Sequence, residues 1–455
     1  MILVAQVLSL AVVSSEKPIT IVHVVADDLG RQDLGYFNRG KTVSPNINKH
    51  IEEGVFLTQY HSYKVCSPSR AAIMTGRYPW AIGYYDMQGH EAVPLNYTML
   101  PAVLAEEGWS THAIGKWNLG NMVRRYTPTF RGFSTFFGYY AAALGDYWYH
   151  GNPSKCPLSK NATKTFITDL SNSSGAEVVE GIRPADSPGV NGTYDQELFT
   201  AEAVRLIEKH GGDNDQNLYI YLAYQNVHTT AQNKETPSGA QPLHAPCKTV
   251  DELYANTASD TFKVMGAMVT ELDYGIGNVT AALEAAGRDW VMILVSDNGG
   301  PINIASANAP LRGGKHTMWD GGLKVVSFVS GPLVPQKVRG TQWDGLACHA
   351  DWLPTIAAGI ANITLPSAVV HHPRPMDGHN LWDAIISGTV SPRTEIVHQV
   401  TLTTMRNMSL FREICFDRNF NLRTNFDSLE TIRSIYLSIH PIFSTHPHGY
   451  DLLIP

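Results

Sequence analysis

The chain has 455 residues, of which 44% are hydrophobic and 16% charged, and its formal net charge is -7 with neutral histidines. This apolar content suffices for a large buried core and excludes a disordered chain. The negative balance argues against a nucleic-acid binder with a broad basic face. No apolar run reaches the roughly 18 residues of a membrane span. The composition therefore predicts a globular protein with no membrane span.

The first segment is a short apolar run from Ile2 to Val13, followed by Ser14, Ser15, Glu16 and Lys17. Such a run before small residues is typical of a secretory signal with a cleavage site, and it predicts a signal peptide over residues 1–15. The basic residues that usually open a signal are missing. A buried first strand is therefore the alternative interpretation.

Seven Asn-x-Ser/Thr triplets without a central proline support export. One such triplet arises easily by chance, whereas seven favour a glycosylated protein of the secretory pathway, either lysosomal or secreted. The triplets begin at Asn96, Asn161, Asn172, Asn191, Asn278, Asn362 and Asn407.

The chain has five cysteines, and none of them forms a C-x-x-C pair, which argues against a zinc ribbon or a thioredoxin motif. In an exported chain the odd count predicts two disulfides and one special thiol. If Cys66 is that thiol, the other four allow three pairings. These four are Cys156, Cys247, Cys348 and Cys415.

Strand-like and helix-like segments alternate along the chain, which predicts an α/β fold with a large, mostly parallel sheet between helices. Met265 to Leu283 carries apolar residues at steps of three and four, the period of a helix packed on a core. Runs rich in apolar and β-branched residues predict strands at 19–26, 218–224, 290–295 and 325–329.

Polar clusters follow three of these predicted strands, where ligands bind in open α/β sheets. Asp27 and Asp28 follow the first strand, His228 follows the second, and Asp297 with Asn298 follows the third. Each cluster alone is equally consistent with a turn or a helix cap. Together, three carboxylates and an amide oxygen suit a hard divalent cation, and without one the carboxylates would raise each other's pKa.

The segment Cys66-Ser67-Pro68-Ser69-Arg70 opens a predicted helix that ends at a glycine, Gly76. A cysteine at a helix N-terminus lies where the helix dipole favours negative charge, so the chemistry of anions is natural there. An ordinary buried or bridged cysteine is the alternative interpretation.

This segment resembles the C-x-P-S-R signature of the type I sulfatases, in which the cysteine is oxidised to formylglycine. The resemblance covers Ile19 to about His398 and looks closest to the arylsulfatase B subgroup, the N-acetylgalactosamine-4-sulfatases. The other matching motifs, in the same order, lie at 26–30, 75–79, 115–120, 296–300, 310–315 with 319–322, and 349–355.

The resemblance implies an alkaline-phosphatase-like catalytic domain over residues 19–398. It implies a sulfuric ester hydrolase that acts on sulfated carbohydrates or aryl sulfates, with a formylglycine-generating enzyme as its maturation partner. A hydrated aldehyde at position 66 would carry two hydroxyl groups. One would attack sulfur, and the other would collapse to expel sulfate, which splits one hard step into two.

The resemblance also assigns roles to individual residues. Lys116 and Lys315 would neutralise sulfate oxygens, and Arg70 would stabilise the modified residue. His228 would protonate the leaving oxygen, although taken alone it is more typical of a structural histidine. The cation, Ca²⁺ with Mg²⁺ as the alternative, would be held by Asp27, Asp28, Cys66, Asp297 and Asn298.

Two features depart from the family pattern. Asn118 replaces the histidine of a G-K-W-H-L-G motif, and an amide cannot act as a general base at ordinary pH; His316 is a candidate replacement. Residues 399–455 do not match the family's small C-terminal antiparallel domain and predict a divergent tail in its place. Two alternative functions follow: an impaired pseudo-sulfatase that binds sulfated glycans, or a phosphodiesterase of the same superfamily.

Overall fold

The structure is a computed structural model, and its chain divides into two units, residues 1–393 and 394–455. Within the described part, no helix combines the length and hydropathy of a membrane span. The predicted signal at 1–15, Cys156, Asn161, Asn191, Asn407 and nearly all of the predicted tail lie outside the described residues. The structure describes 17–84, 92–142, 147–148, 151–153, 166–168, 170–175, 177–179, 192–212, 214–230, 243–399, 415–416 and 422–423.

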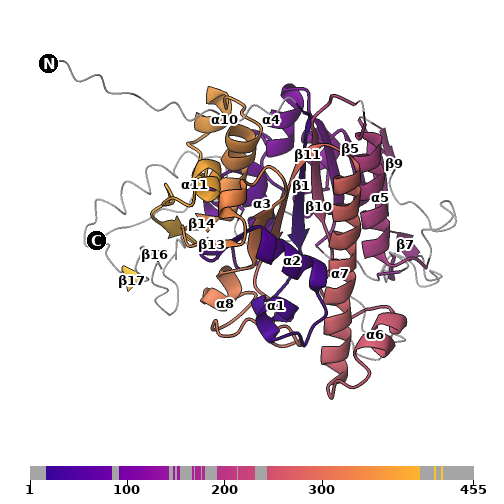
Figure 1. Ribbon diagram of the computed structural model, residues 1–455. Coiled ribbons are helices and arrows are strands. Elements are labelled where there is room, and N and C mark those ends of the chain that lie inside the picture. Colours follow the sequence, from indigo (N-terminus) through magenta and orange to yellow (C-terminus); the bar gives the residue numbers. More distant parts are fainter. Residues whose placement is uncertain are drawn as a thin grey trace, which may run out of the picture. The chain divides into compact units, whose positions relative to one another are not determined.

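The first unit is built on a ten-stranded sheet in the order β13-β2-β12-β11-β1-β10-β4-β5-β8-β9 (Figure 1). Its five central strands run parallel, whereas β12 is antiparallel to β11 on one side and β8 is antiparallel to β5 on the other. The predicted mostly parallel α/β sheet is confirmed. The central strands are β11 (Asp289–Ser296), β1 (Ile19–Ala26), β10 (Leu218–Ala223), β4 (Ser110–Lys116) and β5 (Thr135–Tyr139).

All four predicted strands form, with small shifts at their ends. The run at 19–26 is β1, which is buried from its second residue onwards because helices cover both faces of the sheet. The remaining strands are β2 (Val55–Leu57), β3 (Tyr60–His61), β6 (Gly151–Pro153), β7 (Phe166–Thr168), β8 (Leu170–Ser174), β9 (Glu177–Val179), β12 (Ser327–Ser330), β13 (Thr341–Trp343) and β14 (Ala347–Cys348).

Helices cover the sheet on both faces, and alternate residues of β1 divide between the two sides. Val22 and Val24 pack with helices α2 (Pro45–Glu53), α5 (Asp195–Lys209) and α7 (Asp260–Ala285). The predicted stripe from Met265 to Leu283 is buried on α7, so it is core packing as expected.

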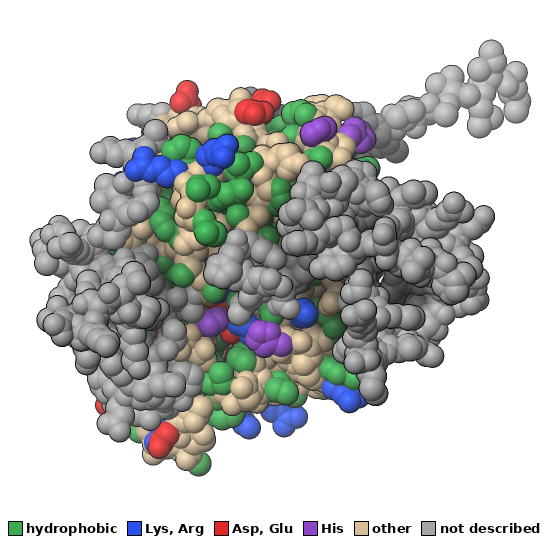
Figure 2. Space-filling model, turned by 180° about the vertical axis from the view of Figure 1, so that it is seen from behind, with side chains coloured by type: hydrophobic (Ala, Val, Ile, Leu, Met, Phe, Trp, Pro, Cys, Tyr) green, Lys and Arg blue, Asp and Glu red, His purple; other side chains and the backbone are tan. Residues whose placement is uncertain are grey.

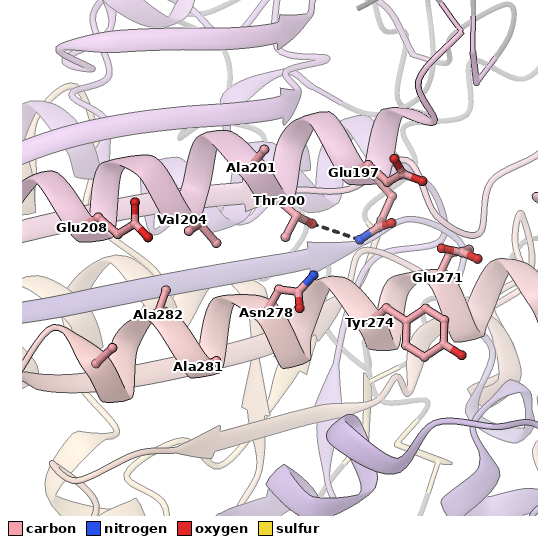
Figure 3. Close-up of a pocket in the computed structure, with 12 residues that line it drawn as sticks. Glu197, Thr200, Ala201, Val204, Glu208, Glu271, Tyr274, Asn278, Ala281 and Ala282 are labelled. Atoms are coloured by element: carbon pink, nitrogen blue, oxygen red, sulfur yellow. Dashed lines mark hydrogen bonds between the residues drawn. The ribbon is translucent and has the colours of Figure 1, made fainter. Parts of the chain in front are cut away.

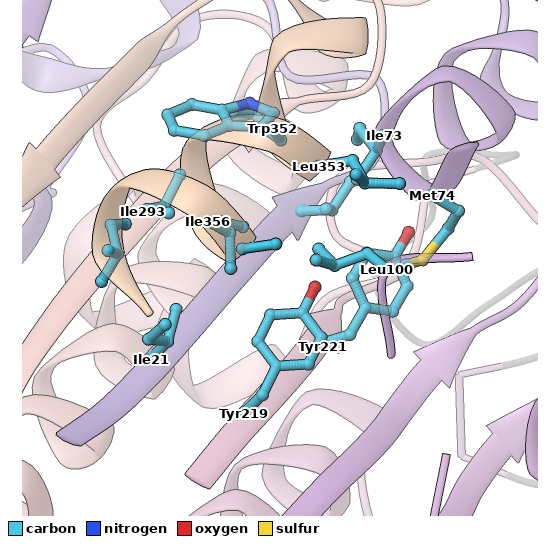
Figure 4. Close-up of a cluster of buried hydrophobic side chains, with 14 of the residues drawn as sticks. Ile21, Ile73, Met74, Leu100, Tyr219, Tyr221, Ile293, Trp352, Leu353 and Ile356 are labelled. Carbon is cyan, nitrogen blue, oxygen red and sulfur yellow. The ribbon is translucent and has the colours of Figure 1, made fainter. Parts of the chain in front are cut away.

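On the opposite face, Ile21 packs with helix α3 (Cys66–Thr75) and with the segment around Ile356 (Figure 4). Tyr219 and Tyr221 of β10 join the same cluster. The other helices are α1 (Gly35–Asn38), α4 (Leu100–Glu106), α6 (Cys247–Leu253), α8 (Asp320–Leu323), α9 (Trp352–Pro354), α10 (Ser367–His371) and α11 (Trp382–Ser387).

The second unit contains a three-stranded antiparallel sheet in the order β15-β16-β17. Each strand has two residues: β15 (Ile396–Val397), β16 (Cys415–Phe416) and β17 (Leu422–Arg423). The units divide after residue 393, five residues before the boundary expected at 398. The tail from 399 stays a prediction, because few of its residues are described.

The cysteine prediction is wrong for two residues. Cys247 and Cys348 are free, so the two expected disulfides cannot both form, and neither of these residues takes part in one. Cys348 is buried in β14 and its backbone N–H bonds Asp351, whereas Cys247 is exposed at the start of α6.

Candidate active site

The two acidic clusters predicted after neighbouring strands do meet in the structure. Ala26 lies beside Ser296 at the ends of β1 and β11, and the amide of Asp297 donates to the carbonyl of Ala26 at 3.0 Å. The amide of Asp28 donates to Asp297 Oδ1 at 3.1 Å. Asp28 has φ 62°, a left-handed conformation that aspartate tolerates better than most residues.

Cys66 lies at the first residue of α3, and its Sγ is 3.5 Å from Asp27 Oδ1. The side chain is fully buried, and burial together with the charge of Asp297 raises the pKa of the thiol to about 12. The unmodified thiol is therefore protonated at neutral pH and is a poor nucleophile. Cys66 is free, which leaves the bridged interpretation without support.

Arg70 lies four residues further along α3, on the same helix face as Cys66. Its guanidinium donates to Asp297 Oδ2 from Nη2 at 2.8 Å and from Nε at 3.1 Å. Nη2 also lies 3.6 Å from Asp27 Oδ2. Burial opposes the charged form, but Asp297 and its neighbours hold the pKa of Arg70 well above its ordinary value.

Two lysines from different segments bind the paired aspartates. Lys116, the last residue of β4, places Nζ 2.6 Å from Asp27 Oδ2. Lys315 places Nζ 2.7 Å from Asp28 Oδ1 and 2.8 Å from Oδ2. Burial lowers the pKa of Lys315, but the surrounding anionic groups outweigh that effect and raise it, so this lysine keeps its proton.

His228 lies beside Lys315, and the hydrogen bonds of its ring indicate its tautomer. Nδ1 is 2.6 Å from the carbonyl of Thr229, which can only accept, so Nδ1 carries the proton. Nε2 then accepts from Lys315 Nζ at 3.0 Å and lies 3.5 Å from Asp28 Oδ2. Burial lowers the pKa of His228, which agrees with a neutral ring at neutral pH.

The donor atoms fit a divalent cation in part. Ligand atoms of Asp27, Asp28, Cys66 and His228 lie within 4.8 Å of one another. Asn298 Oδ1 is buried and has no hydrogen-bond partner among the described residues, while Nδ2 of the same amide donates to Asp28 Oδ1 at 2.7 Å. A buried acceptor without a partner is costly, and a cation would satisfy it.

Asp297 is less available than the other expected ligands. Its Oδ2 accepts from Arg70 and its Oδ1 accepts from the amide of Asp28. The five expected metal ligands thus share one region, and the ligand role of Asp297 stays a prediction. His228, which was expected to act only on the leaving group, lies close enough to be a ligand as well.

The formal charge of this cluster suits an anionic ligand. Arg70, Lys116 and Lys315 balance the three aspartates, and His228 is neutral, so the protein groups sum to zero. A divalent cation would add two positive charges where a singly charged ester would bind. Figure 2 shows histidine, basic and acidic side chains gathered near the middle of one face.

The structure adds residues that the sequence did not assign to the site. The hydroxyl of Tyr221 lies 3.5 Å from Arg70 Nη1, and His349 Nε2 lies 3.2 Å from the carbonyl of Asp297. Tyr221 thus contacts Arg70, and His349 contacts the backbone of Asp297. The segment at His349 belongs to the resemblance, which was a signal for it, whereas Tyr221 looked like an ordinary strand residue.

Asn118, the departure from the family pattern, lies at the edge of the cluster. It has φ 54°, and its Nδ2 donates to Ser67 Oγ at 2.8 Å. The hydroxyl of Tyr84 donates to its carbonyl at 3.2 Å. His316, the candidate replacement base, is exposed directly after Lys315.

A separate groove of about 650 Å³ runs between α5 and α7 (Figure 3). Its lining includes Glu197 and Thr200 from α5 and Glu271, Tyr274 and Asn278 from α7. None of the expected site residues lines it. The groove is therefore distinct from the candidate active site.

Comparison with known proteins agrees with this site. A family model described as Sulfatase matches residues 19–360. Arylsulfatase J of Mus musculus is 33% identical over 391 residues, which cover 84% of this chain and 58% of the relative. The chain thus spans less than two thirds of the length of that relative.

Solved structures show the same fold. The sulfatase PsFucS1 from Pseudoalteromonas sp. superposes with a TM-score of 0.71 at 20% identity, covering 94% of this chain and 92% of its own. The structure of Ps i-CgsB in complex with k-i-k-neocarrahexaose gives 0.66 at 25% identity, covering 82% and 77%. The narrower assignment to the arylsulfatase B subgroup stays a prediction. With its family match over 19–360 and its close likeness to arylsulfatase J, the chain belongs to the sulfatase family.

Proposed function

We propose that the protein hydrolyses sulfate esters of carbohydrates, with small aryl sulfates as surrogate substrates. The observation that carries the proposal is Cys66, buried at the start of α3 and 3.5 Å from Asp27, inside a cluster of three carboxylates and three basic side chains. Such a cluster neutralises an anionic ester before the reaction begins, which favours a transition state that develops charge.

The chain's own residues divide the work. Lys116 and Lys315 supply positive charge to the sulfate oxygens, and Arg70 holds Asp297. The leaving oxygen would take its proton from the pair of Lys315 and His228, which the hydrogen bond from Nζ to Nε2 joins. Tyr221 contacts Arg70 and helps to hold its guanidinium in position.

The thiol of Cys66 is protonated and would attack poorly at neutral pH, so the proposed nucleophile is the formylglycine that the C-x-P-S-R signature at 66–70 implies. When present, the hydrated aldehyde would supply a hydroxyl nucleophile at position 66. A divalent cation held by Asp27, Asp28 and Asn298, Ca²⁺ with Mg²⁺ as the alternative, would polarise the ester and lower the pKa of that hydroxyl. A formylglycine-generating enzyme is then the maturation partner.

A glycosylated protein of the secretory pathway, lysosomal or secreted, is the setting that we propose. Asn96, Asn172, Asn278 and Asn362, which begin four of the Asn-x-Ser/Thr triplets, are exposed. A carbohydrate substrate is supported by the bound hexaose in the structure of Ps i-CgsB. The exposed acceptors suit the addition of glycans at the surface.

The test compares the sulfate ester and a phosphate diester of one phenol, with the wild type and a Cys66→Ala variant from eukaryotic cells. We expect turnover of the sulfate that Cys66→Ala lowers by about 10³-fold or more, because it removes the nucleophile. Faster turnover of the phosphate diester would instead support a phosphodiesterase.

Asn118 favours a second candidate, a pseudo-sulfatase that binds sulfated glycans and releases sulfate slowly. Its amide can donate to Ser67 but takes up no proton at ordinary pH. If this candidate holds, Asn118→His should raise turnover by about 10²–10⁴-fold, the range of general acid–base assistance. An unchanged rate would show that the amide is no obstacle.

A further inference from the structure

Lys315 belongs to a loop whose backbone is closed at its base. The amide of Gly321 donates to the carbonyl of Arg312 at 2.7 Å, and the amide of Lys315 donates to the carbonyl of Gly300 at 3.2 Å. Inside the loop, Thr317 Oγ1 accepts from the amide of Gly314 at 3.2 Å. The segment from Arg312 to Gly321 is therefore held as one piece, with Lys315 directed at Asp28.

Glycines make this closure tight. Gly313 has φ 78°, and a Cβ there would lie 2.6 Å from Thr317 Oγ1 and 2.8 Å from Trp319 Cβ. A Cβ on Gly321 would lie 2.2 Å from the carbonyl oxygen of Gly313. Side chains at these positions would force the loop open. The loop thus fixes Trp319 relative to Lys315.

Trp319 stands just before α8, and half of it is exposed, with a relative accessibility of 50%. The guanidinium of Arg312 lies over its ring, 3.8 Å from the ring centre. Arg312 is itself exposed and forms no ion pair with another described residue. A large aromatic surface and a positive charge are therefore presented together, on the loop that carries Lys315.

We infer that Trp319 and Arg312 form a platform for a sugar ring next to the sulfated group of the substrate. The flat face of a pyranose presents C–H groups that pack on the electron-rich face of an indole. Arg312 would bind an anionic substituent of the same ring, a carboxylate or a second sulfate. The platform rests on the proposed function, because it takes the sulfated sugar to be bound at Lys315.

The stacking of Arg312 on Trp319 contributes too little stability to explain why these two side chains are exposed together. A cation–π contact at an exposed site is worth about 0.5–1 kcal/mol, so it adds little to the stability of the fold. An exposed tryptophan anchored on a closed loop is more useful in binding, because aromatic and arginine side chains dominate recognition surfaces. Trp319 and Arg312 are thus binding residues, and neither touches the reacting atoms.

The test uses Trp319→Ala, Trp319→Phe and Arg312→Ala, each made both alone and together with Cys66→Ala. Chondroitin, heparan and carrageenan sulfate hexasaccharides are titrated into the Cys66→Ala proteins by calorimetry, and KM is measured with the active proteins. We expect Trp319→Ala to weaken binding of at least one hexasaccharide by about 10-fold, and Trp319→Phe by less, since an aromatic ring remains.

Further variants test the charge of Arg312 and distinguish the sugar platform from the proposed sulfate ester hydrolysis. Arg312→Ala should weaken that hexasaccharide most at low salt, because its contact is ionic. Tyr274→Ala removes an exposed aromatic residue on α7 and should change nothing. Equal affinity of Trp319→Ala and its parent, or no hexasaccharide bound at all, overturns the platform. A wild type that binds through Trp319 but never releases phenol from an aryl sulfate contradicts the proposed function and leaves the platform standing.

Discussion

Two buried clusters of opposite charges lie in the first unit, and they differ in how completely they are satisfied. Asp351 accepts from Arg393 at 2.5–3.1 Å and from the amides of Cys348 and His379 at 2.8 Å. Arg393 also donates to the hydroxyl of Tyr78 at 2.7 Å.

The cluster around Asp27 and Asp28 is less complete. Asp28 has a left-handed backbone conformation, and Asn298 Oδ1 has no partner among the described residues. Strain and missing partners persist where function requires them. The comparison shows that the cluster of Asp351 and Arg393 holds chain segments together, whereas the cluster of Asp27 and Asp28 has an unsatisfied acceptor that can bind a ligand.

The largest effect on stability is expected from the first cluster. Arg393→Ala would leave the buried carboxylate of Asp351 without its base, which costs about 3–5 kcal/mol of unfolding free energy. Chemical denaturation measures this loss. Arg393→Lys is the matched variant and should recover part of it. A loss below about 1 kcal/mol would mean that the two clusters do not differ as described.

The second prediction concerns activity in the other cluster. His228→Gln keeps a polar side chain beside Lys315 but removes the group that exchanges a proton. Turnover of an aryl sulfate should fall by about 10²–10³-fold, while the unfolding free energy changes little. A full rate in this variant would assign the leaving-group proton to Lys315 alone.

The third prediction tests directly whether the cluster of Asp27 and Asp28 binds a divalent cation. Free Ca²⁺ at about 100 times its Kd should raise the unfolding free energy by about 2.7 kcal/mol, because the ion binds only the folded state. Thermal denaturation in CaCl₂ and in a chelator measures the difference, with MgCl₂ as the competing ion. Asp28→Ala should abolish the difference, and a shift that survives this change would place the ion elsewhere.

The smallest effect is expected from Asp33, a buried carboxylate outside both clusters. Ser306 and the amides of Gly30 and Ala307 donate to it, and no basic side chain of the described residues does. Burial raises its pKa from 3.8 to about 7. The folded state therefore binds a proton that the unfolded state releases, so this stability is present below about pH 4 and is lost as the pH rises through 7.

Between pH 5 and pH 7 the unfolding free energy should fall by about 2 kcal/mol from this group. Asp33→Asn should flatten that slope, whatever its effect on overall stability. Denaturant titrations at several pH values measure both. A slope that is the same in the two proteins would show that Asp33 is ionised throughout this range.

Part of the fold could be predicted because β11, β1 and β10 are apolar, often β-branched runs, whereas the mixed sequences of β4 and β5 gave no such signal. The run at 19–26 has the bounds of β1, and the stripe from Met265 to Leu283 lies within α7. The meeting of Asp28 with Asp297 also followed, since parallel neighbours end at one edge of a sheet.

Contacts between distant segments could not be predicted in this way. Arg393 and Asp351 are 42 residues apart, and Tyr221 and Arg70 are 151 apart, with no local pattern to join them. The disulfide prediction was wrong for Cys247 and Cys348 because a count of cysteines does not tell which of them lie within reach of one another. The expected roles of Cys66, Arg70, Lys116, His228 and Lys315 stay predictions, although the structure brings these side chains together.

The most direct test of the central claim is a mass spectrum of the peptide that contains residue 66, from protein made in eukaryotic cells and incubated with an aryl sulfate. Cells that modify a control sulfatase serve as the reference. The account predicts a peptide lighter than the cysteine form, from the aldehyde at position 66, together with accumulating phenol. An unmodified thiol in protein from those cells, with no phenol released, would contradict it.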